Sequence, residues 1–218
     1  MCYRYTLKSF EALSSFYEEL ADSAAAEWAP RYNVALTSRM PVITKRARPT
    51  LEAMNFGFTL PARTPGERQM LLGNARAETL LAKPAFRDAA MHRRCLVPAD
   101  GFYEWEKAGT ARLPHYFTLK DHRPFFFAGL WAPAHDSSPT AFCIVTTAPN
   151  TLLKAIHDRM PVILEGETAG AWLGDTPLEP VRLATLCRPL PSDQMSGHRV
   201  DPRVNNARYE TPDCITPI

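Results

Sequence analysis

The sequence predicts a single α+β domain: a mostly antiparallel, strongly curved or barrel-like sheet with a few short helices. The 218 residues include 45% hydrophobic and 22% charged residues, which is typical of a globular chain with one large core. The 20 prolines favour short elements and many turns. Strand-like runs outnumber helical patterns and do not alternate with them as in βαβ units. No repeat or linker divides the chain, so we expect one domain over residues 1–218.

The expected elements are short. Large apolar side chains recur at helical spacing over Ser9–Ser23, which predicts an amphipathic helix. Asp100-Gly101 predicts a hairpin turn between two strands, and Ala62–Gln69 a polar loop. The tail from Ser192 is polar and Pro-rich, with an end that could dock. Strands are expected at Arg31–Ala35, Pro41–Ile43, Leu51–Leu60, Arg94–Pro98, Gly101–Trp105, Tyr116–Leu119, Phe125–Leu130, Phe142–Thr147 and Pro161–Leu164, and short helices at Pro84–Met91, Thr151–Ile156, Thr168–Leu173 and Val181–Leu186.

Composition excludes several classes of function. A formal charge of +2 does not by itself demand an anionic partner, so a basic surface would have to come from clustering. No run of 18 apolar residues and no signal peptide are present, which predicts a cytoplasmic protein with no membrane partner. The five cysteines lack a C-x-x-C pair, and the histidines lack zinc-ligand spacing, so neither disulfides nor a metal are expected. No phosphate-binding glycine loop is present, and we expect no cofactor.

Cys2 directly follows the initiator methionine. If Met1 is removed, by an aminopeptidase or by the protein itself, Cys2 carries an α-amine and a thiol with ordinary pKa values of about 8. Such an aminothiol condenses with an aldehyde and closes a thiazolidine ring, or attacks an acyl carbon. Arg4 would share a strand face with Cys2, favour its thiolate and bind an anion. The alternative is a chance cysteine in a leader strand, which the first five residues alone favour.

Asn74 and Arg76 are two residues apart, so on a strand both side chains point to one face. An arginine offers a bidentate fork to phosphate, and an asparagine both donates and accepts hydrogen bonds. The pair therefore fits an anion-binding site next to a reacting group. The alternative is a polar turn that ends with a helix-capping threonine at Thr79.

Two more stretches place titratable side chains beside apolar strands. Glu104 lies among three aromatic residues, where burial would raise its carboxyl pKa into the range of a neutral-pH acid or base. Trp105 could stack on an unpaired base. His157, in a charged loop, is placed to transfer a proton, with Arg159 as a neighbouring anion-binding residue. The alternatives are an outward-facing glutamate and a tryptophan that belongs to the core.

These stretches, in this order, resemble the SOS response-associated peptidase (SRAP) family. Each segment alone is modest evidence for the family, but the ordered set is highly specific. It covers most of the chain up to about Leu164, with a weaker resemblance at His198-Arg199-Val200. The resembling segments are MCYRY at 1–5, RYNVA at 31–35, NARAET at 74–79, RRCLVPADGFYEW at 93–105 and HDRMPVIL at 157–164.

The resemblance implies a single α+β domain with a curved sheet. It also implies sensing of abasic sites in single-stranded DNA, where the processed N-terminal cysteine joins the ring-opened sugar aldehyde as a thiazolidine. Autocatalytic removal of Met1 and weak lyase activity are further expectations. We expect a monomer whose partner is DNA. The implied site has Cys2 as nucleophile, Asn74, Glu104 and His157 as supporting catalytic residues, and Arg4, Arg76, Arg159 and Trp105 as DNA-binding residues.

Three features depart from the family pattern. Tyr3 stands where the family usually has glycine, and Phe56-Gly57 where it usually has Trp-Gly. In the family, a tryptophan-rich loop often follows and wedges DNA bases apart. Here the loop at 62–68 keeps positive charge but has no aromatic residue, so we expect it still to bind phosphate but to differ in how it separates bases. The residues themselves leave two other functions open. One is a cysteine peptidase or amidase using Cys2, His157 and Glu104, and the other is a non-enzymatic single-strand binder acting through its arginines.

Overall fold

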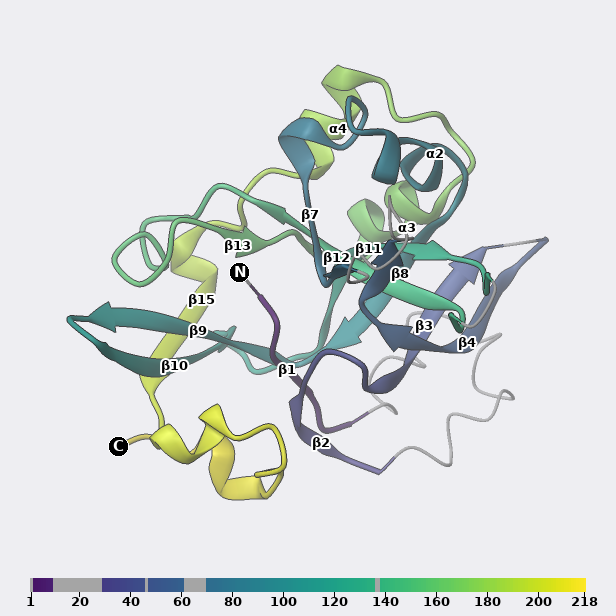
Figure 1. Cartoon of the computed structure of the whole chain (residues 1–218). Coiled ribbons are helices and arrows are strands. Elements are labelled where there is room, and N and C mark those ends of the chain that lie inside the picture. Colours follow the sequence, from purple (N-terminus) through teal and green to yellow (C-terminus); the bar gives the residue numbers. More distant parts are fainter. Residues whose placement is uncertain (1, 10–28, 46, 61–69, 136–137) are drawn as a thin grey trace.

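The computed structural model describes residues 2–9, 29–45, 47–60, 70–135 and 138–218 (Figure 1). Most of the helix expected at Ser9–Ser23 and of the loop at Ala62–Gln69 lies outside these ranges. No helix in the described ranges is long and apolar enough to cross a membrane. The strands are β1 Tyr5–Leu7, β2 Arg31–Val34, β3 Arg39–Lys45, β4 Pro49–Phe56, β5 Phe58–Leu60, β6 Met70–Leu72, β7 Asn74–Arg76, β8 Arg94–Ala99, β9 Gly101–Ala108, β10 Ala111–Leu119, β11 Phe125–Ala132, β12 Ala141–Thr147, β13 Met160–Pro161, β14 Ile163–Leu164 and β15 Met195–Arg199, and the α-helices are α2 Pro84–His92, α3 Gly166–Leu173 and α4 Pro180–Leu186.

The strands form two large sheets and a small hairpin of β5 and β6. The first sheet has the order β15-β10-β9-β1-β2. The second has the order β13-β12-β4-β3-β8-β11-β14, with β7 also paired to β12, and the additional pairing of β11 with β12 closes part of it into a ring. Among the described pairs, only β12 with β4 and β12 with β7 are parallel. The prediction of a mostly antiparallel, strongly curved α+β fold is confirmed.

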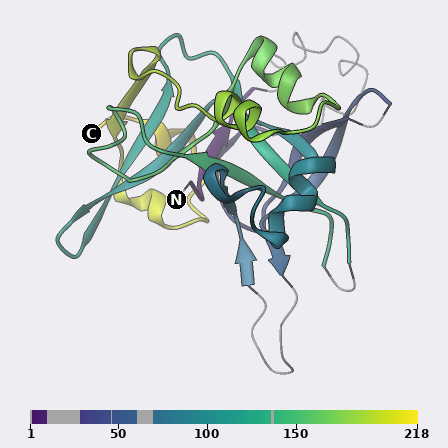
Figure 2. The same cartoon turned by 90° about the horizontal axis from the view of Figure 1, so that it is seen from above.

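The helices cover the second sheet. α2 and α3 pack on β8 and β11, and Figure 2 shows the α-helices (teal and green) on the side away from the C terminus. Pro84 and Pro180 begin α2 and α4, where a missing backbone N–H costs nothing, and a capping box of Glu165 and Thr168 begins α3. The indole of Trp172 donates to the carbonyl of Cys95 (3.1 Å), which fastens α3 to the ring.

The predicted hairpin at Asp100-Gly101 is wrong. β8 belongs to the second sheet and β9 to the first, so the chain crosses between sheets at this point. Asp100 is buried there, and its carboxylate accepts hydrogen bonds from the Thr6 hydroxyl and the Lys8 backbone N–H. A turn signal marks where the chain changes direction, but it does not say which strands pair.

Three other expectations differ from the structure. The strand expected at Leu51–Leu60 divides at Gly57, whose φ of +115° a side chain would not tolerate easily, into β4 and β5. Residues 151–156 form turns and not a helix. The polar tail contributes a strand, β15, which pairs with β10. Backbone pairing with β10 holds this strand in the sheet, so its sequence shows no apolar alternation that would have predicted it.

The C-terminal segment docks on the first sheet, as was expected for its end (yellow in Figure 1). Arg31 makes a bidentate ion pair with Glu210, with distances of 2.6 and 2.8 Å. The buried amide of Asn33 donates to the carbonyls of Val204 (3.1 Å) and Tyr209 (2.8 Å). A small second core forms beneath this segment, composed of Tyr103, Tyr116, Val200, Val204 and Cys214.

Candidate active site at the seam of the two sheets

The four predicted catalytic residues come from both sheets and meet at the seam between them. Cys2 lies three residues before the start of β1, and Glu104 lies in β9 of the first sheet. Asn74 lies in β7, and His157 in the loop that joins β12 to β13 of the second sheet. The N-terminal segment runs between β9 and β13 in Figure 1. No two of the four are neighbours in sequence, so only the packing of the sheets brings them together.

Cys2 is fully buried, and Asn74 holds its backbone. The Asn74 amide Nδ2 donates to the Cys2 carbonyl at 3.0 Å and to the Gly73 carbonyl at 2.9 Å. The thiol of Cys2 lies 3.9 Å from the Arg4 carbonyl, a weak hydrogen bond. Burial, together with the charge of Glu104, raises the pKa of the Cys2 thiol. The expectation that Arg4 favours a thiolate is therefore wrong: the thiol is held in its protonated form.

Tyr3 fits because of Gly73. A Cβ atom at Gly73 would lie 2.7 Å from the Tyr3 ring atom Cε1 and 2.5 Å from Leu36 Cδ2. The tyrosine ring thus packs directly on the backbone that precedes Asn74. The large residue after Cys2 is accommodated by the absence of a side chain at position 73, next to the amide that holds Cys2.

Glu104 faces the interior. Its neighbour on the same strand face, Phe102, belongs to the main core, and Glu104 itself is 1% exposed. Burial is the main cause that raises the pKa of Glu104 to about 7. The alternative of an outward-facing glutamate is wrong, and the predicted raised pKa is confirmed. Near neutral pH this carboxyl exists in both protonation states, as a proton shuttle requires.

His157 faces Glu104 across the seam, with 4.0 Å between Nε2 and the Glu104 Oε2 atom. Burial lowers the pKa of His157, so the imidazole is mostly neutral at neutral pH. Its other nitrogen, Nδ1, accepts a hydrogen bond from the Arg159 backbone N–H at 3.0 Å. Because Nδ1 accepts this hydrogen bond, the single proton of the neutral ring is on Nε2, which points toward Glu104. The two groups can therefore exchange a proton with each other or with a ligand between them.

The three predicted phosphate-binding arginines have different surroundings. Arg76 is exposed at the end of β7. Arg159 makes a bidentate ion pair with Glu78 and donates to the Thr146 carbonyl at 2.7 Å. Arg4 donates to Asn33 Oδ1 at 2.7 Å and to carbonyls of the C-terminal segment.

Trp105 lies on the opposite face of β9 from Glu104. Its indole N–H donates to Asn205 Oδ1 at 2.6 Å, in the C-terminal segment. The centroid of its ring lies 6.3 Å from the centroid of the Tyr103 ring. The structure therefore does not bring Trp105 to the group formed by the four catalytic candidates.

Sequence reasoning gave no role to Glu78 and Asn33, which the structure connects to Arg159 and Arg4. An asparagine within the apolar run Arg31–Ala35 was an available signal for Asn33. Glu78 stood within the NARAET segment, but its partner is 81 positions away. Among the described residues, no group of three or more His, Cys, Asp and Glu side chains is arranged to hold a metal.

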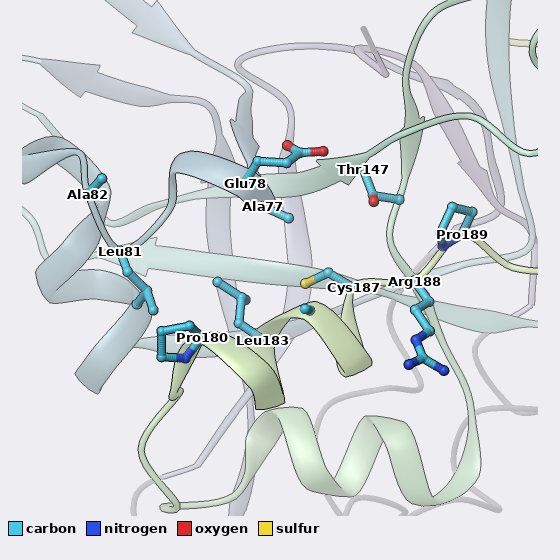
Figure 3. A pocket seen from close by; sticks show the side chains of 11 residues that line it. Ala77, Glu78, Leu81, Ala82, Thr147, Pro180, Leu183, Cys187, Arg188 and Pro189 are labelled. Atoms are coloured by element: carbon cyan, nitrogen blue, oxygen red, sulfur yellow. The ribbon is translucent and has the colours of Figure 1, made fainter.

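A mainly apolar cavity of about 470 Å³ lies beside the turn that carries Glu78, and none of the four catalytic candidates lines it. Figure 3 shows Glu78 and Thr147 on one side of it, opposite Leu183 and Cys187 of the α4 region. Glu78 thus lies between this cavity and Arg159, which it binds.

Comparison with known proteins identifies the family. The model of the family described as "SOS response associated peptidase (SRAP)" matches residues 1–207 of the chain. The chain is 34% identical over 221 residues to the abasic site processing protein YoqW of Bacillus subtilis, with 99% of both chains covered. It is 30% identical over 196 residues to the abasic site processing protein YedK of Escherichia coli, with 86% of this chain and 85% of that protein covered. A solved structure from Bacteroides thetaiotaomicron shares the fold, with a TM-score of 0.80, 24% identity and full coverage of both chains. The chain belongs to the SOS response associated peptidase (SRAP) family.

Proposed function

We propose that this protein processes abasic sites in single-stranded DNA as part of a DNA damage response, and that it does so by covalent attachment through Cys2. The observation that carries the proposal is the arrangement around Cys2: an amide that holds its carbonyl at 3.0 Å, and a buried carboxyl of pKa about 7 facing a neutral imidazole. Relatives named abasic site processing proteins support the choice of substrate.

The reaction begins once Met1 is removed. The free α-amine of Cys2 attacks the aldehyde carbon of the ring-opened sugar and forms a carbinolamine. Glu104 gives a proton to the departing hydroxyl, so that water leaves and an imine forms. The Cys2 sulfur then bonds to the imine carbon, while its proton passes to the imine nitrogen. The net change joins aldehyde and aminothiol into a thiazolidine with release of one water.

The other site residues support these steps. Asn74 fixes the Cys2 carbonyl and hence the direction of the amine. His157 exchanges a proton with Glu104 or with the sugar oxygen. If the thiol fails to close the ring, the imine allows β-elimination, which is a weak lyase activity. Removal of Met1 by the protein itself would use the same nucleophile on an acyl carbon.

We assign the phosphate contacts first to Arg76, because its side chain is exposed beside Asn74. For Arg4, Arg159 and Trp105 a DNA contact remains a prediction, since each already donates to a protein partner. Binding through arginines should weaken as salt rises, because phosphate contacts release counterions.

The test combines intact mass with a denaturing gel. Untagged protein is weighed for loss of Met1 and mixed with a single-stranded oligonucleotide that carries one abasic site. We expect an SDS-resistant adduct that Cys2→Ala abolishes and that Cys214→Ala, a matched change in the second core, leaves intact. Loss of Met1 without an adduct would refute the proposal and favour a peptidase acting on other substrates.

A further inference from the structure

Glu78 joins the two segments that carry the second sheet's catalytic residues. It follows β7, in a 3₁₀ turn over Ala77–Thr79. Both of its carboxylate oxygens bind the guanidinium of Arg159, at 2.8 Å each, and Arg159 also donates to the Thr146 carbonyl of β12. In the sheet, β12 pairs with both β7 and β13. The ion pair therefore spans β12 and fastens the loop bearing His157 to the strand bearing Asn74.

The same loop sets the hydrogen-bonding state of His157. The Arg159 backbone N–H donates to His157 Nδ1 at 3.0 Å, which leaves the ring proton on Nε2, toward Glu104. The Asp158 carboxylate lies 3.1 Å from the same Nδ1 and would instead stabilise a proton there. Asp158 is 85% exposed, so solvent screens its attraction. When the loop is held at Arg159, the Arg159 backbone N–H stays hydrogen-bonded to Nδ1, and Asp158 does not draw a proton there.

We propose that Glu78 is a positioning residue of the cross-linking site, acting through Arg159 to hold His157 in the Nε2–H form facing Glu104. This inference rests on the proposed reaction. The Arg159 side chain is 12% exposed, so its guanidinium has little water around it and relies on the ion pair with Glu78 more than a surface arginine would. On its other side Glu78 borders the cavity of Figure 3, and the bidentate pair with Arg159 fixes its direction.

The proposal separates chemistry from DNA binding. Glu78 occupies both terminal nitrogens of Arg159, so we expect Arg159 to serve the loop more than a phosphate. Neutralising Glu78 would remove a negative charge near Arg76, and this cannot weaken attraction to DNA. The expected signature is thus slower cross-linking with unchanged or tighter non-covalent binding. A misfolded variant would lose both.

The first experiment compares Glu78→Gln with Glu167→Gln, an exposed glutamate in the first turn of α3. The rate of adduct formation is measured on an abasic oligonucleotide, and affinity on the same strand without the lesion. We expect Glu78→Gln to slow the adduct by about 10- to 100-fold, the range for a displaced catalytic group, and to bind DNA at least as tightly as wild type. Glu167→Gln should change neither. An unchanged adduct rate, or an affinity that falls in step with the rate, would overturn the proposal.

The second experiment needs no reaction: the His157 ring is titrated by NMR in wild type and in Glu78→Gln. The charged groups around His157 are the N-terminal amine, Glu104, Asp158 and Lys107, and the Arg159 backbone N–H binds its Nδ1. Burial is the main cause that lowers the His157 pKa, so a released loop should let it rise toward 6.5. A pKa that stays or falls overturns the proposal, whether or not wild type forms an adduct. Absence of a wild-type adduct counts only against the proposed function.

Discussion

Replacing Glu104 by glutamine should abolish a pH dependence of stability that the buried carboxyl creates. Burial raises its pKa from 4.5 to about 7, so the folded protein keeps a proton that the unfolded chain loses at lower pH. The stabilising contribution is complete below pH 4.5 and is lost as pH rises through about 7. A pKa change of this size corresponds to roughly 3 kcal/mol of unfolding free energy. The side chain is 1% exposed, so solvent screening does not reduce this figure appreciably.

Urea unfolding between about pH 5 and pH 8 measures this effect. The Glu104→Gln variant has nearly the same shape and cannot ionise, so its free energy of unfolding should be closest to that of wild type at the acidic end of this range. At pH 8 its free energy of unfolding should exceed that of wild type by roughly 3 kcal/mol. Glu179→Gln, at an exposed helix N-cap without a side-chain capping bond, is the matched control and should show no such trend. Glu104→Gln should also slow adduct formation, because a glutamine side chain cannot shuttle a proton. A stability difference that stays constant over the whole pH range would refute the argument that burial raises this pKa.

Two further predictions concern DNA binding and packing. Arg76→Ala should weaken binding to single-stranded DNA irrespective of sequence and lower the slope of log affinity against log salt by about 1, as measured by fluorescence anisotropy. Arg112→Ala, an exposed arginine of β10, is its control, and an unchanged slope would exclude a phosphate contact at Arg76. Gly73→Ala should destabilise the protein by about 1–3 kcal/mol, because its methyl group would lie 2.5 Å from Leu36 and 2.7 Å from Tyr3. Gly170→Ala meets no atom within 4 Å and should instead stabilise α3 by about 0.5–1 kcal/mol, so equal effects in thermal unfolding would contradict this packing argument.

Sequence patterns predicted the local setting of a candidate site residue where that residue carried its own local signal. Glu104 stood among aromatic residues, and the structure gives it the burial and the raised pKa that this setting suggested. The spacing of Asn74 and Arg76 placed both on one strand face, with buried Ala75 on the other. Period-two alternation fixes faces in this way because successive strand side chains point in opposite directions.

The same alternation did not say what each face would meet. Arg4 was expected beside the Cys2 thiol, yet its guanidinium binds the C-terminal segment about 200 positions away. Trp105 contacts the same segment, since it occupies the opposite face of β9 from Glu104. Neither partner is encoded near these residues in the chain.

The sequence by itself determined the chemical groups, the strand faces they occupy and, through an ordered set of motifs, the family. The tertiary structure alone decided that Asp100 marks a crossing between sheets, that β11 and β12 close a ring, and that Glu78 fastens the His157 loop across β12. The physical reason is that periodicity records how each strand divides between core and surface. Which strands pair, and which charges meet over them, depends on the packing of segments far apart in the chain.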